Sequence, residues 1–327
     1  MNGIKITGTG SYAPPLVVTN DDLAEILDTS DEWIFSRTGI KTRRYNGGRP
    51  NFEMAVQAAQ NALESAGITA LDVDYIIVST STPDFLYPNT ACLVQRLIGA
   101  ENAACLDINA ACTGFVSGLE IARGLLYSGY DRILFIASES LSKHVDFTDR
   151  ATCVLFGDEA GAVILERDEN KLFASFMKAK GVSPENPMLY YKINYEQNCS
   201  FKEFDYTPPE YKQNFQMDGK EVYKFAVEAM PEAVRAVCEK AGAGLDEIDL
   251  FIPHQANVRI IQTAIKTLGI PAEKVCINIE NHGNTSSACM AVCLDELNKA
   301  GKLKSGMKIC FAGFGAGLTY GAIIIEL

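Results

Sequence analysis

The chain has 327 residues, of which 47% are hydrophobic and 21% are charged, as in an ordinary soluble globular protein with room for two domains. Its formal net charge is −12 and no lysine-rich tract offsets it, so we expect no nucleic-acid partner. The first residues lack the apolar core of a signal peptide, and no apolar run reaches the ~20 residues that cross a bilayer. We therefore expect a cytoplasmic protein without membrane contact.

Ten cysteines are spread along the chain, mostly in apolar segments and without a CxxC pair. In a reducing cytosol such cysteines serve as small hydrophobic residues. Zinc sites usually contain closely spaced pairs of cysteines, so we predict no metal site.

The predicted elements form two similar series along the chain. The pairs, first half before second, are helix 54–67 with helix 225–242, strand 73–80 with strand 248–255, strand 104–109 with strand 275–280, and strand 131–139 with strand 307–315. Strands that alternate with helices at this spacing predict two α/β units with parallel pairing. We place the N-terminal half at residues 1–170 and the C-terminal half at residues 218–327.

Residues 171–217 separate the two predicted halves. From residue 178 onward this segment has no clear periodicity and is rich in aromatic residues, proline and asparagine. We interpret it as an irregular excursion, and such long loops are either functional or mobile.

Three residues lie at predicted strand ends. Cys112 stands between a strand and the helical pattern that begins at Gly114, where a helix N-terminus favours a thiolate, although a packed core thiol is the alternative. His254 ends a strand of the second half, and Asn284 follows the next one, almost as the repeat counterpart of Cys112. Ligands of α/β sheets bind beyond the carboxyl ends of strands, so pseudo-two-fold packing would bring these side chains to one cavity.

The chain has only two other histidines. His282 lies close to Asn284 in sequence, and we interpret it as a structural residue that supports its neighbours. His144 is interpreted as a solvated loop residue. His254 is therefore the candidate for chemistry.

Eight stretches are distinctive. They are GTGSYAPP (8–15), DTSDEWIFSRTGI (28–40), NAACTGF (109–115), DRATCVLFGDEAGA (149–162), FQMDGKEVYKFAV (215–227), PHQANVRII (253–261), HGNTSSA (282–288) and GFGAGLTYG (313–321). Together they resemble the β-ketoacyl-[acyl-carrier-protein] synthase III family of the thiolase superfamily, along the whole chain. The resemblance implies a thiolase-like fold, in which two duplicated α/β halves form a five-layered αβαβα structure, and a homodimer.

The resemblance also implies a chemistry. An acyl-CoA primer would acylate Cys112, and malonyl-[acyl-carrier-protein] would then condense with it by decarboxylation, giving 3-oxoacyl-[acyl-carrier-protein] and initiating fatty acid synthesis. His254 and Asn284 would donate hydrogen bonds to the enolate oxygen. The backbone N–H groups of Cys112 and Ala316 would form a second oxyanion hole. Acyl-CoA and malonyl-carrier protein would be substrates, and no cofactor or metal is implied.

Binding residues follow from the same matching stretches. CoA would be bound by Thr29, Trp33, Arg37 and Arg150; the carrier protein would dock on Lys224, Arg259 and Lys266; and the acyl pocket would be shaped by Tyr87 and Phe314. In the family an aromatic ring at position 87 often crosses the dimer interface. A tyrosine there favours short primers over octanoyl-CoA, because its hydroxyl adds bulk and needs a partner when buried.

Other functions fit the residues less well. A thiolase needs a second cysteine in the loop 313–317, where none occurs, and elongating synthases use two histidines where this chain has Asn284. Plant-type polyketide synthases lack the DEWIFSRTG element, and papain-like hydrolases carry a CGSCW-like signature that is absent here. An intact Cys-His-Asn set disfavours a catalytically silent subunit. A related enzyme of a polyketide- or quinolone-like pathway stays open as the alternative.

Overall fold

The computed structural model describes residues 3–183, 189–190 and 215–327. The strands are β1 (Ile4–Tyr12), β2 (Leu16–Thr19), β3 (Thr42–Tyr45), β4 (Tyr75–Ser79), β5 (Ala104–Ile108), β6 (Arg132–Ser140), β7 (Asp158–Arg167), β8 (Phe173–Ala179), β9 (Leu189–Tyr190), β10 (Gln216–Met217), β11 (Leu250–Pro253), β12 (Lys308–Gly315) and β13 (Thr319–Glu326). The helices are α1 (Asn20–Ala24), α2 (Asp31–Thr38), α3 (Asn51–Ala66), α4 (Thr90–Ile98), α5 (Gly114–Tyr127), α6 (Gly219–Ala241), α7 (Val258–Leu268), α8 (Ile279–His282) and α9 (Ala288–Lys299).

The two large sheets share one topology. The first has the strand order β1-β7-β6-β4-β5 and the second has the order β8-β13-β12-β11. In each sheet the first two pairings are antiparallel and the following ones are parallel. The duplicated α/β architecture predicted from the sequence is thus confirmed.

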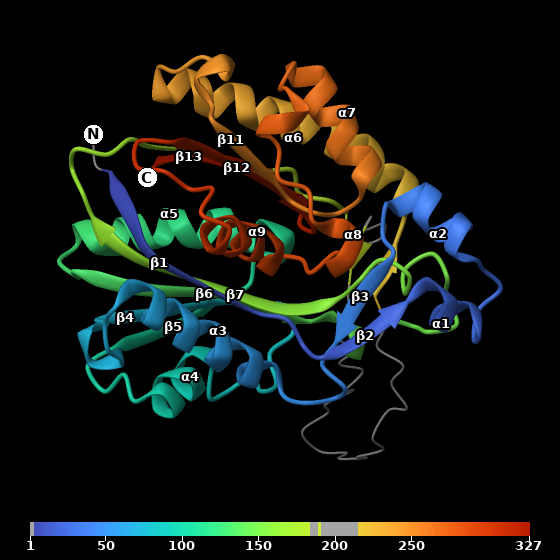
Figure 1. Cartoon of the computed structure of the whole chain (residues 1–327), viewed down its shortest axis with the longest axis horizontal. Coiled ribbons are helices and arrows are strands. Elements are labelled where there is room, and N and C mark those ends of the chain that lie inside the picture. The colour runs from blue at the N-terminus through green and yellow to red at the C-terminus, as the bar shows by residue number, and fades with distance from the viewer. Residues whose placement is uncertain (1–2, 184–188, 191–214) are drawn as a thin grey trace, which may run out of the picture.

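The layers stack in the order helix, sheet, helix, sheet, helix (Figure 1). Helices α3 and α4 cover the outer face of the first sheet, α5 and α9 lie between the sheets, and α6 and α7 cover the second sheet. The central helices must be apolar or small all round because both of their faces are buried. Gly118 of α5 shows how close this packing is: a Cβ there would lie 2.1 Å from the Phe135 ring.

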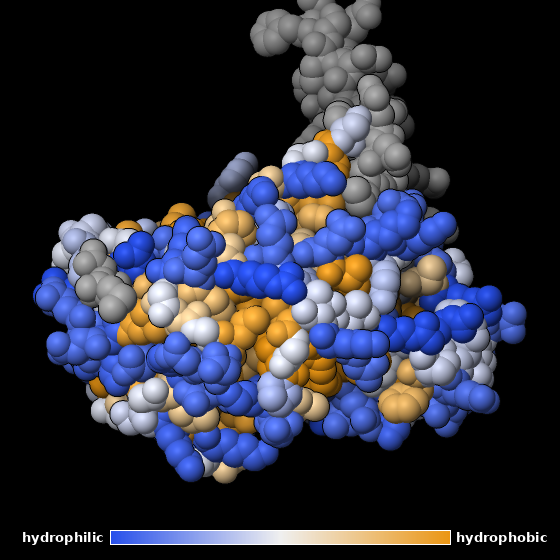
Figure 2. Space-filling view, turned by 90° about the horizontal axis from the view of Figure 1, so that it is seen from above, coloured by the Kyte–Doolittle hydropathy of each residue, from blue (hydrophilic) through white to orange (hydrophobic). Residues whose placement is uncertain are grey.

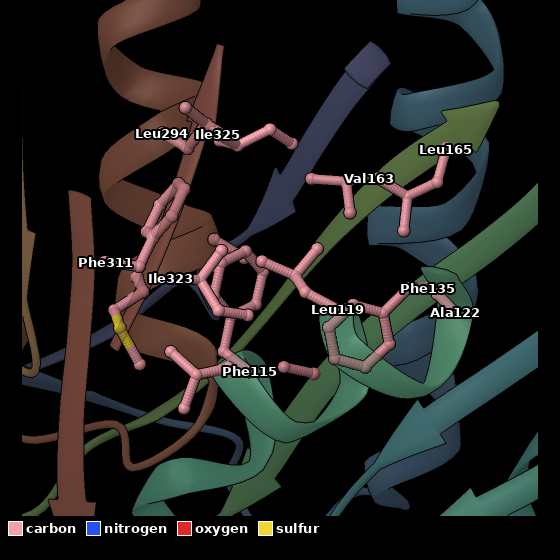
Figure 3. Close-up of a cluster of buried hydrophobic side chains, with 14 of the residues drawn as sticks. Phe115, Leu119, Ala122, Phe135, Val163, Leu165, Leu294, Phe311, Ile323 and Ile325 are labelled. Atoms are coloured by element: carbon pink, nitrogen blue, oxygen red, sulfur yellow. The ribbon is translucent and has the colours of Figure 1, made fainter. Parts of the chain in front are cut away.

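The core between the sheets is centred on Phe115, in the first turn of α5 (Figure 3). Its ring stacks on Phe135 of β6 at 5.5 Å and meets Phe311 of β12 edge-on at 5.2 Å. Burying a phenylalanine side chain stabilises a fold by about 1.5–3 kcal/mol. The start of α5 is consequently held from both sheets, which matters because Cys112 lies just before it.

The prediction of a strand at 275–280 is wrong. Only Val275 pairs with the second sheet, in a single bridge to Phe251, and the chain then turns into α8. The Gln255 side chain takes the place of a ladder: its Nε2 donates to the Cys276 carbonyl at 3.1 Å, and its Oε1 accepts from the Asn278 N–H at 3.1 Å. A side chain therefore satisfies the backbone groups that a fifth strand would have paired.

The predicted irregular segment 171–217 begins with a regular strand. β8 pairs antiparallel with β13 along its whole length and has buried Phe173 and Ala174 at its start. This strand belongs to the second sheet, so a domain boundary at residue 171 falls just before an integral strand. Further on, β9 pairs with β10. The remainder of the predicted excursion, residues 184–188 and 191–214, lies outside the described residues.

Candidate active site

Cys112 lies in a single 3₁₀ turn between β5 and α5 and is 8% exposed. The end of β12 passes directly against it. A Cβ at Gly315 would lie 2.8 Å from the Cys112 Cβ and 3.0 Å from its backbone nitrogen. Only glycine permits this approach, which places the backbone of the glycine-rich loop beside the thiol.

Burial dominates the ionisation of Cys112. It raises the pKa of the thiol to about 11, against the hydrogen bond that the Ser286 hydroxyl donates to the sulfur at 3.4 Å. The buried carboxyl group of Glu139 raises the pKa further. Desolvation of the charged form therefore outweighs the hydrogen bonds that favour the thiolate.

His254 continues the line of β11. Its backbone N–H donates to the Ala312 carbonyl at 2.8 Å, which fixes the residue at the end of the sheet. The ring is 1% exposed, lies 5.4 Å from the Phe314 ring in an edge-on arrangement, and has its Nδ1 3.1 Å from the Cys289 sulfur. Burial lowers the pKa of His254 to about 3, so the imidazole is neutral at physiological pH.

Asn284 follows α8 and reaches across to the first half. Its N–H donates to the Leu155 carbonyl at 2.8 Å, and its carbonyl accepts from the Gly157 N–H at 3.0 Å. The side-chain Oδ1 accepts from the Ser286 N–H at 2.9 Å. That bond occupies the acceptor end of the amide, so the NH₂ group is the end left to act in the cavity.

These three side chains line one cavity of about 230 Å³. The same cavity is lined by Phe314, Trp33, Arg37 and Arg150. Cys112 is buried whereas Arg37 and Arg150 are exposed, so the cavity leads from the surface down to the thiol. Cys112 after β5, His254 after β11 and Asn284 after α8 are far apart in the sequence and thus meet at one place.

The mouth of the cavity carries an aromatic and cationic cluster. The guanidinium groups of Arg37 and Arg150 lie 4.5 and 4.9 Å from the centre of the Trp33 ring. Arg150 also donates to the Asp28 carbonyl at 2.6 Å. Thr29 does not line the cavity, but its buried hydroxyl has no hydrogen-bond partner among the described residues.

The three predicted docking cations lie outside the cavity, on α6 and α7. Lys224 pairs with Glu221 at 2.5 Å, and Arg259 donates to the Ser36 carbonyl at 2.7 Å, near the end of α2. Lys266 is exposed and has no ion-pair partner within the described ranges. Figure 2 looks onto the face that α6 and α7 form at the top of Figure 1, where hydrophilic side chains surround an apolar central region.

Two further predicted residues are not on the cavity wall of this chain. Tyr87 is 86% exposed, in the loop before α4, and Ala316 is half-buried between Gly315 and Gly317. Tyr87 is therefore not part of the cavity wall within one chain, whereas Ala316 directly follows Gly315, which lines the cavity.

Sequence reasoning missed two residues of the site. Ser286 bonds both Asn284 and Cys112, and Cys289 lies against the ring of His254. Ser286 stands within the HGNTSSA stretch, which is a usable signal. Nothing in the local pattern distinguishes Cys289 from the other cysteines in apolar segments.

The interpretation of His282 as a structural residue agrees with its contacts. Its Nδ1 bonds the fully buried Glu159, and its Nε2 lies 2.9 Å from Glu296. His144 is half-buried and packs edge-on against Phe215 at 5.8 Å, so it is not simply solvated. No group of three or more potential metal ligands exists among the described residues. None of the helices in that part of the chain combines the length and apolarity needed to cross a bilayer.

Comparison with known proteins gives consistent matches. Residues 106–181 match the family model described as 3-oxoacyl-[acyl-carrier-protein (ACP)] synthase III, and residues 238–327 match its C-terminal counterpart. A β-ketoacyl-[acyl-carrier-protein] synthase III of Clostridium acetobutylicum is 44% identical, with 100% of this chain and 99% of the relative covered.

Solved structures agree. The 3-oxoacyl-[acyl-carrier-protein] synthase III of Aquifex aeolicus superimposes with a TM-score of 0.90 at 44% identity, covering 99% of this chain and 100% of that one. The priming β-ketosynthase of the R1128 polyketide pathway superimposes with a TM-score of 0.92 at 33% identity, covering 100% and 96%. The chain therefore belongs to the β-ketoacyl-[acyl-carrier-protein] synthase III family and is a condensing acyltransferase with a thiolase-like fold.

Proposed function

We propose that the chain condenses an acyl-CoA primer with malonyl-[acyl-carrier-protein], through an acyl group held on Cys112, and so starts fatty acid synthesis. The observation that carries this proposal is the cavity in which a thiol, a neutral imidazole and an oriented amide NH₂ meet. A nucleophile and two neutral hydrogen-bond donors are the groups that such a condensation needs.

The first step is transfer of the acyl group. The Cys112 sulfur attacks the thioester carbonyl, the new S–C bond forms, and CoA leaves and takes up the thiol proton. Because burial raises the pKa of Cys112 to about 11, the thiolate must be assisted when it forms. The Ser286 hydroxyl, 3.4 Å from the sulfur, is the donor in place to do this.

The second step forms the carbon nucleophile. The bond between the malonyl carboxylate and Cα breaks, CO₂ departs, and the electron pair moves to the thioester oxygen as an enolate. His254 and Asn284 donate to that oxygen, and no base is required because decarboxylation itself supplies the carbanion. A neutral imidazole suits this role, since its remaining N–H is a donor that does not have to be regenerated.

The third step joins the two fragments. The enolate carbon attacks the acyl carbonyl on Cys112, the new C–C bond forms, and the S–C bond breaks to return the thiolate, which regains a proton from solvent. The negative charge that builds on the acyl oxygen is held by the backbone N–H groups of Cys112 and Ala316. The close passage of Gly315 against Cys112 supports this assignment, because it brings the loop backbone beside the reacting sulfur.

CoA binds at the mouth of the cavity. Trp33 offers a flat ring for adenine, and Arg37 and Arg150 offer charge for the phosphates. Thr29 follows Asp28, whose carbonyl accepts from Arg150, and so lies beside the proposed nucleotide site. Malonyl-carrier protein docks through Lys224, Arg259 and Lys266 on α6 and α7, which gives a local cationic surface on an acidic chain.

The enzyme acts as a homodimer in which Tyr87 closes the acyl pocket of the partner subunit. Three apolar side chains support this interface, because they are exposed on β5, α4 and the loop before α4: Leu106, Leu97 and Leu86. β5 is also the edge of the first sheet, and an unprotected apolar edge strand invites pairing with another chain. Phe314 forms the wall of the pocket on the same chain as Cys112.

A panel of acyl-CoA thioesters tests the proposal. Each is mixed with the protein, and the intact mass is measured before and after malonyl-carrier protein is added. We expect one acyl group per chain, a preference for short primers over octanoyl-CoA, and loss of the label when the extender arrives. Tyr87→Ala should shift the profile toward longer chains. Acylation without subsequent condensation would refute the proposed reaction. An unchanged chain-length profile in Tyr87→Ala would refute the proposal that Tyr87 closes the acyl pocket.

A further inference from the structure

The ring of His254 is in contact with a second buried thiol, that of Cys289 in the first turn of α9. The sulfur lies 3.1 Å from His254 Nδ1, 3.0 Å from the Ser286 carbonyl oxygen and 3.4 Å from the Gln255 backbone nitrogen. Cys289 is 2% exposed. Its single proton therefore has two candidate acceptors, and the choice between them decides which nitrogen of His254 carries hydrogen.

The two choices have opposite consequences in the cavity. If the thiol donates to Nδ1, the imidazole proton is on Nε2, the nitrogen left to face the cavity, and His254 is a hydrogen-bond donor there. If the thiol donates to the Ser286 carbonyl, Nδ1 carries the proton and donates to sulfur. Nε2 then presents a lone pair to the enolate oxygen, which repels it.

Physical chemistry favours the first choice. An imidazole nitrogen is a better acceptor than an amide carbonyl, whereas a thiol sulfur is only a weak acceptor for an N–H. The sulfur already receives the N–H of Gln255, and the second arrangement would give it another N–H donor. Burial raises the pKa of Cys289 well above its ordinary value, so the thiol keeps its proton for donation.

We propose that Cys289 is a positioning residue whose S–H holds His254 in the Nε2–H tautomer and so keeps it a donor to the enolate oxygen. This inference rests on the proposed role of His254 in condensation. Cys289 touches neither substrate, and it acts through the imidazole alone. The edge-on contact with Phe314 at 5.4 Å fixes the plane of the ring, and the thiol fixes its proton.

The test uses the full-length enzyme with Cys289→Ala, which removes the donor, and Cys289→Ser, which keeps one donor proton at a similar size. We expect Cys289→Ala to lower kcat of condensation by about threefold to tenfold, the worth of one hydrogen bond, with KM for malonyl-carrier protein and the rate of Cys112 acylation unchanged. Cys289→Ser should restore most of kcat. Cys293→Ala, one turn further along α9 and equally buried, is the matched control and should condense normally.

The second readout does not depend on activity. Long-range ¹H–¹⁵N correlation spectra of histidine-labelled protein show which ring nitrogen carries hydrogen, and the chain has only three histidines to assign. The wild type and Cys289→Ser should show Nε2–H at His254, and Cys289→Ala should show a mixture of tautomers. An Nδ1–H wild type, or equal loss of kcat in the serine and alanine variants, would overturn the inference. Normal condensation in His254→Ala would overturn the proposed role of His254 instead, while the tautomer spectra would still report on Cys289.

Discussion

The two halves share a sheet topology but contribute different chemistry to the cavity. In the proposed mechanism the first half supplies Cys112, which must ionise to react, and the second half supplies His254 and Asn284, which must stay neutral and donate. Burial therefore acts in opposite senses: it raises the pKa of Cys112 and hinders the thiolate, whereas it lowers the pKa of His254 and secures the neutral ring. A duplicated fold can bury both kinds of group equally, but burial favours the reactive form of His254 and disfavours that of Cys112.

The halves also differ at the fifth strand. In the first half β5 is a full strand that ends just before Cys112, whereas in the second half the corresponding segment keeps one bridge, at Val275. Freed from the ladder, that segment turns into α8 and carries Asn284 to the backbone of Leu155 and Gly157 in the other half. The loss of the fifth strand in the second half is what brings Asn284 across to the cavity that Cys112 lines.

The largest effect is expected when the side chain that the first half contributes to the proposed reaction is removed. Cys112→Ala should abolish both acylation by acyl-CoA and condensation, because no other thiol of the described residues lines the cavity. Intact-mass measurement and peptide mapping check this. Cys310→Ala, in the core of the second half, should be acylated normally. Acyl label that persists in Cys112→Ala would show that the nucleophile lies elsewhere.

The contact between the halves can be broken at His282 of α8, which bonds the buried Glu159 of β7. His282→Ala leaves that carboxylate unpaired and should lower the free energy of unfolding by about 3–5 kcal/mol. Chemical denaturation measures this, with His144→Ala as the control. A loss below about 1 kcal/mol would show that the pair does not stabilise the interface between the halves.

The same pair predicts a pH dependence. Burial lowers the pKa of His282, but the charge and hydrogen bond of Glu159, with those of Glu296, raise it overall to about 10 in the folded state. An unfolded histidine titrates near pH ~6.5. The stabilisation is thus complete below about pH 6.5 and is lost as pH rises through the folded pKa. The difference between the wild type and His282→Ala should shrink over that window.

The donors can be removed without removing the nucleophile. His254→Ala and Asn284→Ala should each lower the rate of condensation by about 10²–10³, while acylation of Cys112 changes little, because both side chains are proposed to donate to the enolate oxygen. Stopped-time assays of each half-reaction separate the two effects. A variant that acylates slowly but condenses at the normal rate would show that the substituted residue acts in acylation and not in condensation.

The effect of burial on Cys112 can be measured directly. Below the pKa of about 11, the thiolate fraction of Cys112 rises tenfold per pH unit, so alkylation by iodoacetamide should rise by about that factor per unit from pH 7 to 9. Ser286→Ala removes a donor to the sulfur and should lower the rate at each pH. A plateau beginning near neutral pH would show that the thiolate is stabilised after all.

The smallest expected effect concerns the surface of the second half. Lys224→Glu should raise KM for malonyl-carrier protein by about twofold to fivefold and leave kcat unchanged, because exposed charges act mainly on encounter. Lys304→Glu, in the loop between α9 and β12, is the control. Arg259 is a poorer probe, since its guanidinium also binds the Ser36 carbonyl near the end of α2. An equal rise in KM for malonyl-CoA would mean that Lys224 acts on binding of the malonyl thioester itself and not on docking of the carrier protein.

The repeat of helices and strands could be predicted because each element carries a strong local pattern, as in the apolar run of β4 and the Ala-Gly end of α3. The absence of a strand at 275–280 could not be predicted, because the backbone there is bonded by the side chain of Gln255, which is distant in sequence. Cys112 and His254 could be placed together because each follows a strand of its half, whereas Asn284 follows α8 and not the strand that was predicted before it. The pKa of Cys112 and the contact of Cys289 with His254 depend on depth and tertiary packing, which a linear pattern does not contain.

Ser286 limits how far this enzyme can be redesigned. Its N–H holds the amide of Asn284, its hydroxyl bonds the sulfur of Cys112, and its carbonyl oxygen lies 3.0 Å from the sulfur of Cys289. Its φ of 50° lies in the left-handed region, which a β-branched threonine tolerates poorly. Glycine would accept that backbone but has no hydroxyl. The walls of the cavity near Phe314 and Trp33 can be varied to admit new substrates, whereas this one serine is the fixed reference point around which such variation must be built.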